Sequence, residues 1–78
     1  QHLASRFAAK EAAMKALGTG HSNGVLWRDI EVVRSIGKPR LCFYDGAFKQ
    51  FEAMGAQSSM VTLSHSGDFA LAQVLLTG

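Results

Sequence analysis

The sequence is poor in the features that mark secreted and membrane proteins. Among its 78 residues there is one cysteine, Cys42, and no uninterrupted apolar run approaches the length of a membrane span. A bilayer-spanning helix needs about 20 consecutive apolar residues. A single cysteine excludes an internal disulfide framework and fits a reducing compartment. We therefore expect a cytoplasmic protein without membrane association, in which Cys42 is a small apolar residue of a strand.

Charged residues are also scarce. They make up 18% of the sequence, against 47% hydrophobic residues, a composition typical of a globular domain rather than a disordered segment. The net charge of +2 is compatible with a phosphate-bearing ligand or an acidic partner. Because no Lys/Arg cluster is interleaved with aromatic residues, nucleic-acid binding is not expected. A chain this short buries only about 60% of its unfolded surface, so we expect it to depend on a further segment or on partner subunits.

The order of helical and extended patterns predicts one α+β domain. Residues Leu3–Leu17 lack Gly and Pro and favour a helix that ends at Gly18, and a second helix is capped by Asp45 and ends at Gly55. Four strands are expected, over Leu26–Ile36, Arg40–Tyr44, Met60–Ser64 and Phe69–Leu76. The order αββαββ predicts a helix packed on a mostly antiparallel sheet. Because the last strand is almost wholly apolar, we expect it in the middle of the sheet or at an interface.

The first helix combines an apolar stripe with charged flanks. At helical spacing, Leu3, Phe7, Met14 and Leu17 share one stripe, which should face a core. Lys10 falls inside this stripe. An ammonium group is costly to bury there unless it is paired or reaches solvent.

The charged flanks of this helix allow two interpretations. Glu11 and Lys15, four residues apart, could form an ordinary surface ion pair. Arg6 and Lys10 are two cations at the same spacing and repel each other, so an anion nearby would relieve them. A neighbouring carboxylate would serve this purpose as well as a phosphate.

Two polar segments outside this helix also need an interpretation. The glycines of Gly18-Thr19-Gly20 follow the helix, whereas a phosphate-binding loop precedes one, so they are expected only to end the helix. His65 lies between Ser64 and Ser66, where it could donate to a phosphate or ribose oxygen or simply hold a turn. Ser64 and His65 do not predict a hydrolase pair, because adjacent strand residues point to opposite faces.

Four blocks of the sequence, in this order and spacing, resemble the holo-[acyl-carrier-protein] synthases, which are 4′-phosphopantetheinyl transferases. The blocks are Leu3–Gly20, Trp27–Val32, Gly37–Pro39 and Thr62–Val74. The resemblance implies transfer of the phosphopantetheine arm of coenzyme A to a serine of acyl carrier protein, in fatty acid biosynthesis. It also implies a Mg²⁺ ion on the pyrophosphate and a homotrimer with active sites at the subunit interfaces.

The resemblance also assigns roles to individual residues. Glu11 matches a metal ligand of the family and Lys15 a contact to the phosphates, so both are expected to be catalytic. Arg6, Ser64 and His65 match residues at the adenosine 3′-phosphate end of the coenzyme. The acyl carrier protein is acidic as a class. Its candidate contacts are Arg28, Arg34 and Lys49, each of which is more readily explained as part of a solvated face.

One part of the family pattern has no counterpart. The family begins with a strand that carries a second metal-binding Asp, and residues 1–78 hold no such block. Asp29, Asp45 and Asp68 lie in other blocks and do not replace it. We therefore expect the C-terminal portion of a transferase domain, inactive by itself. The alternatives are a non-catalytic α+β assembly module and the transferase domain of a larger fatty acid synthase.

Overall fold

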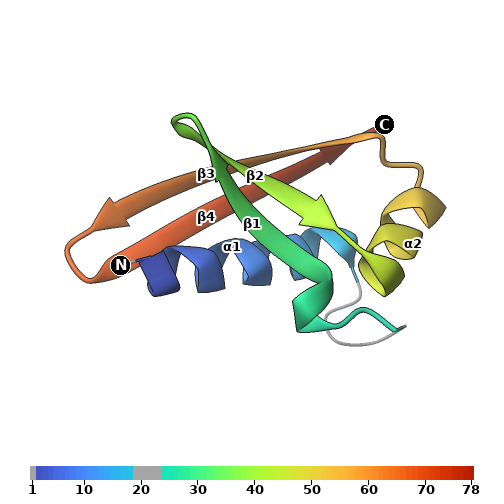
Figure 1. The fold of residues 1–78 in the computed structure, drawn as a ribbon, viewed down its shortest axis with the longest axis horizontal. Helices are drawn as coiled ribbons and strands as arrows, with labels where there is room; N and C mark the ends of the chain where they lie inside the picture. The colour runs from blue at the N-terminus through green and yellow to red at the C-terminus, as the bar shows by residue number, and fades with distance from the viewer. Residues whose placement is uncertain (1, 19–23) are drawn as a thin grey trace.

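The computed structural model describes residues 2–18 and 24–78, and it has the expected α+β order. The elements are α1 (His2–Leu17), the 3₁₀ helix η1 (Trp27–Asp29), β1 (Ile30–Ser35), β2 (Lys38–Phe43), α2 (Asp45–Ala53), β3 (Ser58–Ser66) and β4 (Phe69–Thr77). The strands pair as two antiparallel hairpins, β1 with β2 and β3 with β4. α1 lies along the β3–β4 hairpin, while the β1–β2 hairpin crosses β3 (Figure 1).

Residues 26–29 correct the first expected strand, which was placed over Leu26–Ile36. The chain forms a 3₁₀ turn here before β1 begins at Ile30. The Asp29 carboxylate accepts the Leu26 N–H at 3.1 Å, and the Asp29 N–H donates to the Leu26 carbonyl at 2.9 Å. These two hydrogen bonds close a turn in place of an extended conformation. Asp side chains commonly have this effect, because they bind nearby backbone N–H groups.

The last strand, β4, is paired on one side only. Among the described residues it pairs with β3 alone, from Phe69 opposite Ser66 to Thr77 opposite Ser58. Its expected place in the middle of a sheet is therefore wrong for this structure, whereas its place at an interface stays a prediction. Burial alternates along β4, which leaves every second side chain exposed on the face opposite α1.

The buried face of α1 differs from the predicted stripe. Met14 and Leu17 are buried as expected, but Leu3 is 82% and Phe7 57% exposed. Small residues four positions apart take their place in the buried face: Ser5, Ala9 and Ala13. Small side chains let a helix approach its neighbour closely, and the prediction overlooked them because it followed only large apolar residues.

The region between α1 and η1 accommodates Lys10 and Phe7. The Lys10 ammonium donates to the Trp27 carbonyl at 3.2 Å and lies 5.3 Å from the centroid of the Trp27 ring. The ring of Phe7 packs on that of Trp27 with centroids 5.1 Å apart. The expectation that Lys10 needs a partner is thus confirmed, and a carbonyl with an aromatic face supplies it.

α2 closes the other end of α1. The Gln50 side-chain amide donates to the Leu17 carbonyl at 3.0 Å, which satisfies one of the acceptors left over at a helix C-terminus. Asp45 does not cap α2 as expected. The cap position belongs to Tyr44, whose carbonyl accepts the N–H groups of Ala47 and Phe48, and Asp45 becomes the first helical residue with a φ of 47°.

Candidate functional site

The polar residues of α1 border two different hollows. Arg6 and Lys10 line one of about 290 Å³, hereafter the basic hollow, together with Arg28, Ile30, Glu31, Val32 and Tyr44. Lys15 lines a larger groove of about 640 Å³, in which Ala12 and Ala16 face residues of β3 and β4. Glu11 is exposed and is among the lining residues of neither hollow. The structure therefore places the predicted phosphate-binding cations on both sides of α1.

The basic hollow contains a tyrosine–carboxylate pair that the sequence interpretation missed. The Tyr44 hydroxyl donates to Glu31 Oε1 at 2.7 Å. This hydrogen bond, followed by that with the neighbouring Cys42, raises the pKa of Tyr44 from 10.0 to about 12. Glu31 lies directly opposite Cys42 in the hairpin, so only the strand register, which was not predicted, could have revealed the cluster.

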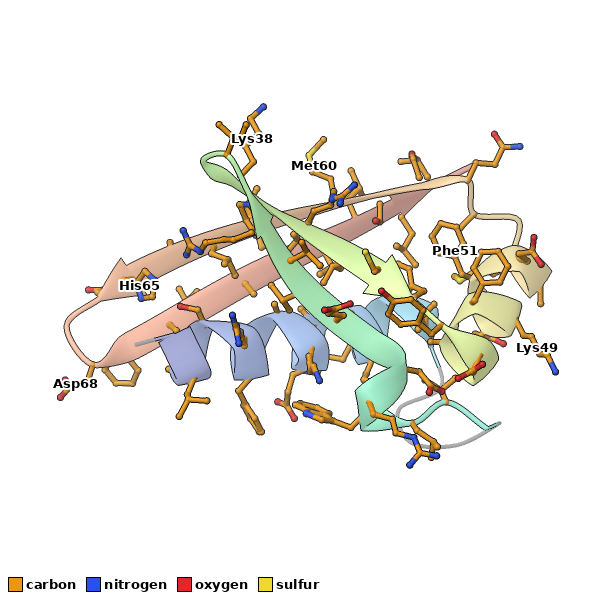
Figure 2. The ribbon with its side chains drawn as sticks, in the orientation of Figure 1. Lys38, Lys49, Phe51, Met60, His65 and Asp68 are labelled. Atoms are coloured by element: carbon orange, nitrogen blue, oxygen red, sulfur yellow. The ribbon has the colours of Figure 1, made fainter. Side chains whose placement is uncertain are left out.

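His65 is joined to α1 by a hydrogen bond between distant parts of the chain. The Ser5 hydroxyl lies 2.9 Å from His65 Nε2, and the two residues are 60 positions apart. Figure 2 shows His65 near the end of β3, over the N-terminal half of α1, with Asp68 at the adjoining turn. The contact brings His65 beside the residue that precedes Arg6.

Ser64 and His65 lie on opposite faces of β3. His65 shares the helix-facing side with Val61 and Leu63, because side chains alternate along a strand. Ser64 instead lines a groove of about 500 Å³ with Thr62 and Gln73. The structure thus brings His65, but not Ser64, towards Arg6.

Lys15 and His65 lie towards opposite ends of α1. Ser5, which contacts His65, is ten residues from Lys15, and at 1.5 Å per residue this separates their backbones by about 15 Å along the helix. One ligand that touches both side chains must therefore be extended. A compact anion would reach only one end.

The carboxylates fit one part of a metal site. In residues 2–18 and 24–78, no three His, Cys, Asp or Glu side chains are grouped so that they could hold a metal ion. The Asp29 carboxylate is buried and binds the Leu26 N–H. Glu11 offers a single exposed carboxylate, which suits Mg²⁺ because that ion takes one or two carboxylates and completes its shell with phosphate oxygens and water.

Comparison with known proteins identifies the family. Residues 1–74 match the 4′-phosphopantetheinyl transferase superfamily, and the chain therefore belongs to it. The resemblance seen in the four sequence blocks is confirmed.

No helix in the described ranges combines the length and the apolar character that a membrane span requires.

The similar proteins are holo-[acyl-carrier-protein] synthases. The chain is 51% identical over 77 residues to that of Geobacter metallireducens, covering 97% of this chain and 61% of the relative. It is 52% identical over 75 residues to that of Nitratidesulfovibrio vulgaris, covering 95% and 60%. The chain thus spans about three fifths of the length of these relatives.

Two solved structures have the same fold. The holo-[acyl-carrier-protein] synthase of Neisseria meningitidis is 36% identical with a TM-score of 0.86, covering 99% of this chain and 62% of that one. The Helicobacter pylori enzyme, solved in complex with coenzyme A, is 29% identical with a TM-score of 0.81, covering 96% and 64%.

Proposed function

We propose that the complete protein is a Mg²⁺-dependent transferase that moves the 4′-phosphopantetheine arm of coenzyme A to a serine of apo-acyl carrier protein. The proposal includes a cytoplasmic role in fatty acid biosynthesis. Its main support is that α1, in a member of this superfamily, presents the carboxylate of Glu11 and the ammonium of Lys15 at exposed positions one turn apart. The names of its relatives and the coenzyme A bound by one structural neighbour also support it.

In this proposal the Glu11–Lys15 end of α1 acts on the pyrophosphate. Glu11 would hold Mg²⁺ together with phosphate oxygens, and the ion, when bound, neutralises charge there. The serine oxygen forms a bond to the phosphorus that carries pantetheine, and the bridging P–O bond to the nucleotide phosphate breaks. Adenosine 3′,5′-bisphosphate leaves, and the Lys15 ammonium stabilises its growing negative charge. The serine hydroxyl proton passes to a water molecule or to the Glu11 carboxylate.

The other end of α1 would bind the nucleotide. We assign Arg6 and His65 to the adenosine 3′-phosphate, since they lie near Ser5 and about 15 Å along the helix from Lys15. An extended dinucleotide-like ligand suits this separation. Ser64 faces the opposite side of β3, and its role at this end stays a prediction.

Assembly and further residues would complete the site. We propose that residues 1–78 are the C-terminal portion of the transferase domain and that the second metal-binding carboxylate comes from the remainder. We also propose a homotrimer. Its support is the apolar side chains exposed on the face of β3–β4 opposite α1, which are those of Met60, Phe69, Leu71 and Leu75. Exposed apolar patches of this kind mark protein interfaces.

The decisive experiment detects the product on the carrier protein. The complete product of the gene is incubated with apo-acyl carrier protein, coenzyme A and Mg²⁺, and the carrier protein is weighed by mass spectrometry. We expect a phosphopantetheine adduct from the complete protein and none from residues 1–78 alone. Binding of the carrier protein without any adduct would instead favour a non-catalytic assembly module, a candidate favoured by the single exposed carboxylate of Glu11.

A further inference from the structure

Ser5 is one of two polar residues that are buried in the described part of the chain; the other is Asp29. The Asp29 carboxylate has a local task, since it closes the turn before β1. Ser5 is 4% exposed, and its hydroxyl reaches across to His65 Nε2 on β3. The partner of this buried hydroxyl is thus an exposed imidazole 60 residues away. This suggests that the hydroxyl serves to orient the imidazole ring.

We propose that Ser5 is a positioning residue, which holds the ring of His65 with a hydrogen-bond donor available for a phosphate group. The inference rests on the proposed function, in which His65 binds the 3′-phosphate of the coenzyme. It adds a residue that acts through His65 without touching the ligand.

The chemistry of the hydroxyl group supports this role. A neutral imidazole has one N–H donor and one acceptor nitrogen. If the Ser5 hydroxyl donates to Nε2, the proton lies on Nδ1, which is then a donor. In the protonated ring Nε2–H donates to the Ser5 oxygen, and Nδ1–H is still a donor. A backbone carbonyl at this place would instead bind Nε2–H and leave Nδ1 of the neutral ring as an acceptor, which repels phosphate.

The surroundings of the ring explain why it needs to be held. His65 shares a hollow of about 150 Å³ with Asp68 of the adjoining turn, so the ring borders open space on this side (Figure 2). On its other side, Ser5 borders a small hollow with two guanidinium groups, those of Arg6 and Arg34. The Ser5 bond keeps the ring docked on α1, next to the residue that borders the hollow of these two cations.

The variant Ser5→Ala tests the proposal without disturbing the fold. The position belongs to the buried stripe that already contains Ala9 and Ala13, and alanine is the better helix former. A matched control is Ser58→Ala, which removes another hydroxyl pair, with Thr77, at the far end of the same hairpin. Neither variant introduces volume or charge.

The kinetic test compares two substrates in the complete protein. With coenzyme A, Ser5→Ala should raise KM about 3- to 10-fold, the usual effect of one hydrogen bond, and leave kcat nearly unchanged. With 3′-dephospho-coenzyme A, which lacks the phosphate, KM should not change. In a His65→Gln background Ser5→Ala should have no further effect. An equal rise with both substrates, or no rise with coenzyme A, would overturn the proposal.

A second test does not depend on transfer. The ¹⁵N shifts of the His65 ring report its tautomer, and Ser5→Ala, unlike Ser58→Ala, should lower the share that carries the proton on Nδ1. Titration with adenosine 3′,5′-bisphosphate and adenosine 5′-monophosphate should show that Ser5→Ala reduces the preference for the bisphosphate. If both results appear while no adduct forms on the carrier protein, the proposed function fails and Ser5 keeps its role. Unchanged tautomers would reject the role of Ser5.

Discussion

The two ends of α1 differ in how much of their surroundings this chain supplies. Near the N-terminal end, the hydroxyl of Ser5 forms a hydrogen bond with His65. In the middle of the helix, the ammonium of Lys10 donates to the Trp27 carbonyl. Further along, Glu11 and Lys15 are exposed, and in the described ranges Glu11 belongs to no group of three or more His, Cys, Asp or Glu side chains that could hold a metal ion. The contacts at the proposed nucleotide end thus lie within residues 1–78, whereas in our proposal the metal end takes a further carboxylate from the rest of the protein.

The largest expected effect concerns the metal end. In the complete protein, Glu11→Gln should lower the rate of phosphopantetheine transfer about 1000-fold or more, because an amide replaces the charged metal ligand. The rate is followed by mass spectrometry of the carrier protein. Glu52→Gln, on the exposed surface of α2, is the matched control and should leave the rate unchanged. Comparable rates for Glu11→Gln and wild type would remove Glu11 from the site.

The burial of large apolar side chains also differs between the two ends of α1. The free energy of unfolding of matched variants reports this difference. Leu17 is 1% exposed, so Leu17→Ala should lower the free energy of unfolding by about 3 kcal/mol through lost burial and a cavity. The matched variant Leu3→Ala, at the exposed end, should cost less than about 0.5 kcal/mol. Urea unfolding of the complete protein measures both. A similar cost for both variants would mean that Leu3 is covered by residues beyond this chain.

A smaller loss is expected from the cation at the metal end. Lys15→Ala should reduce kcat about 10- to 100-fold, since one charge that stabilises the leaving phosphate is removed. Lys38→Ala provides the control, because Lys38 is exposed at the turn between β1 and β2 and points away from α1 (Figure 2). If Lys15→Ala changes only KM for the carrier protein, Lys15 belongs to the docking surface and not to the reaction.

The smallest effect concerns Tyr44, in the basic hollow beside Arg6. Its pKa rises from 10.0 to about 12 because its hydroxyl donates to Glu31. A raised pKa means that the bond stabilises the fold fully below about pH 10 and that this contribution is lost as the pH rises towards 12. The phenolate absorbance, taken as the difference between wild type and Tyr44→Phe, should titrate near 12. In Glu31→Gln, the titration midpoint of Tyr44 should move back towards 10. An unchanged midpoint in this variant would contradict the pairing of Tyr44 with Glu31.

The sequence predicts the order of elements well but the contacts between them poorly. The signals of the helices and strands are local, and the family blocks follow one another at a fixed spacing, so both are visible in one sequence. The Ser5–His65 bond joins positions 60 residues apart, and the Tyr44–Glu31 bond depends on the register of a hairpin. Neither hydrogen bond can be inferred from a local stretch of the sequence.

Side-chain size explains the main error on α1. The prediction followed large apolar residues and placed Leu3 and Phe7 in the core. The structure buries Ala9 and Ala13, because close packing of a helix on a hairpin favours small residues. Ser64 faces away from His65 by the simple alternation of a strand, which the sequence did predict.

The packing of α1 on β4 has a consequence for the nascent chain. The helix that carries Glu11 is translated before the strand Phe69–Thr77, which it contacts extensively. Its buried stripe therefore stays uncovered on the ribosome until translation of this segment is complete, and contacts between such distant positions form slowly. A deletion of β4 alone would thus leave α1 intact in sequence but without its main packing partner.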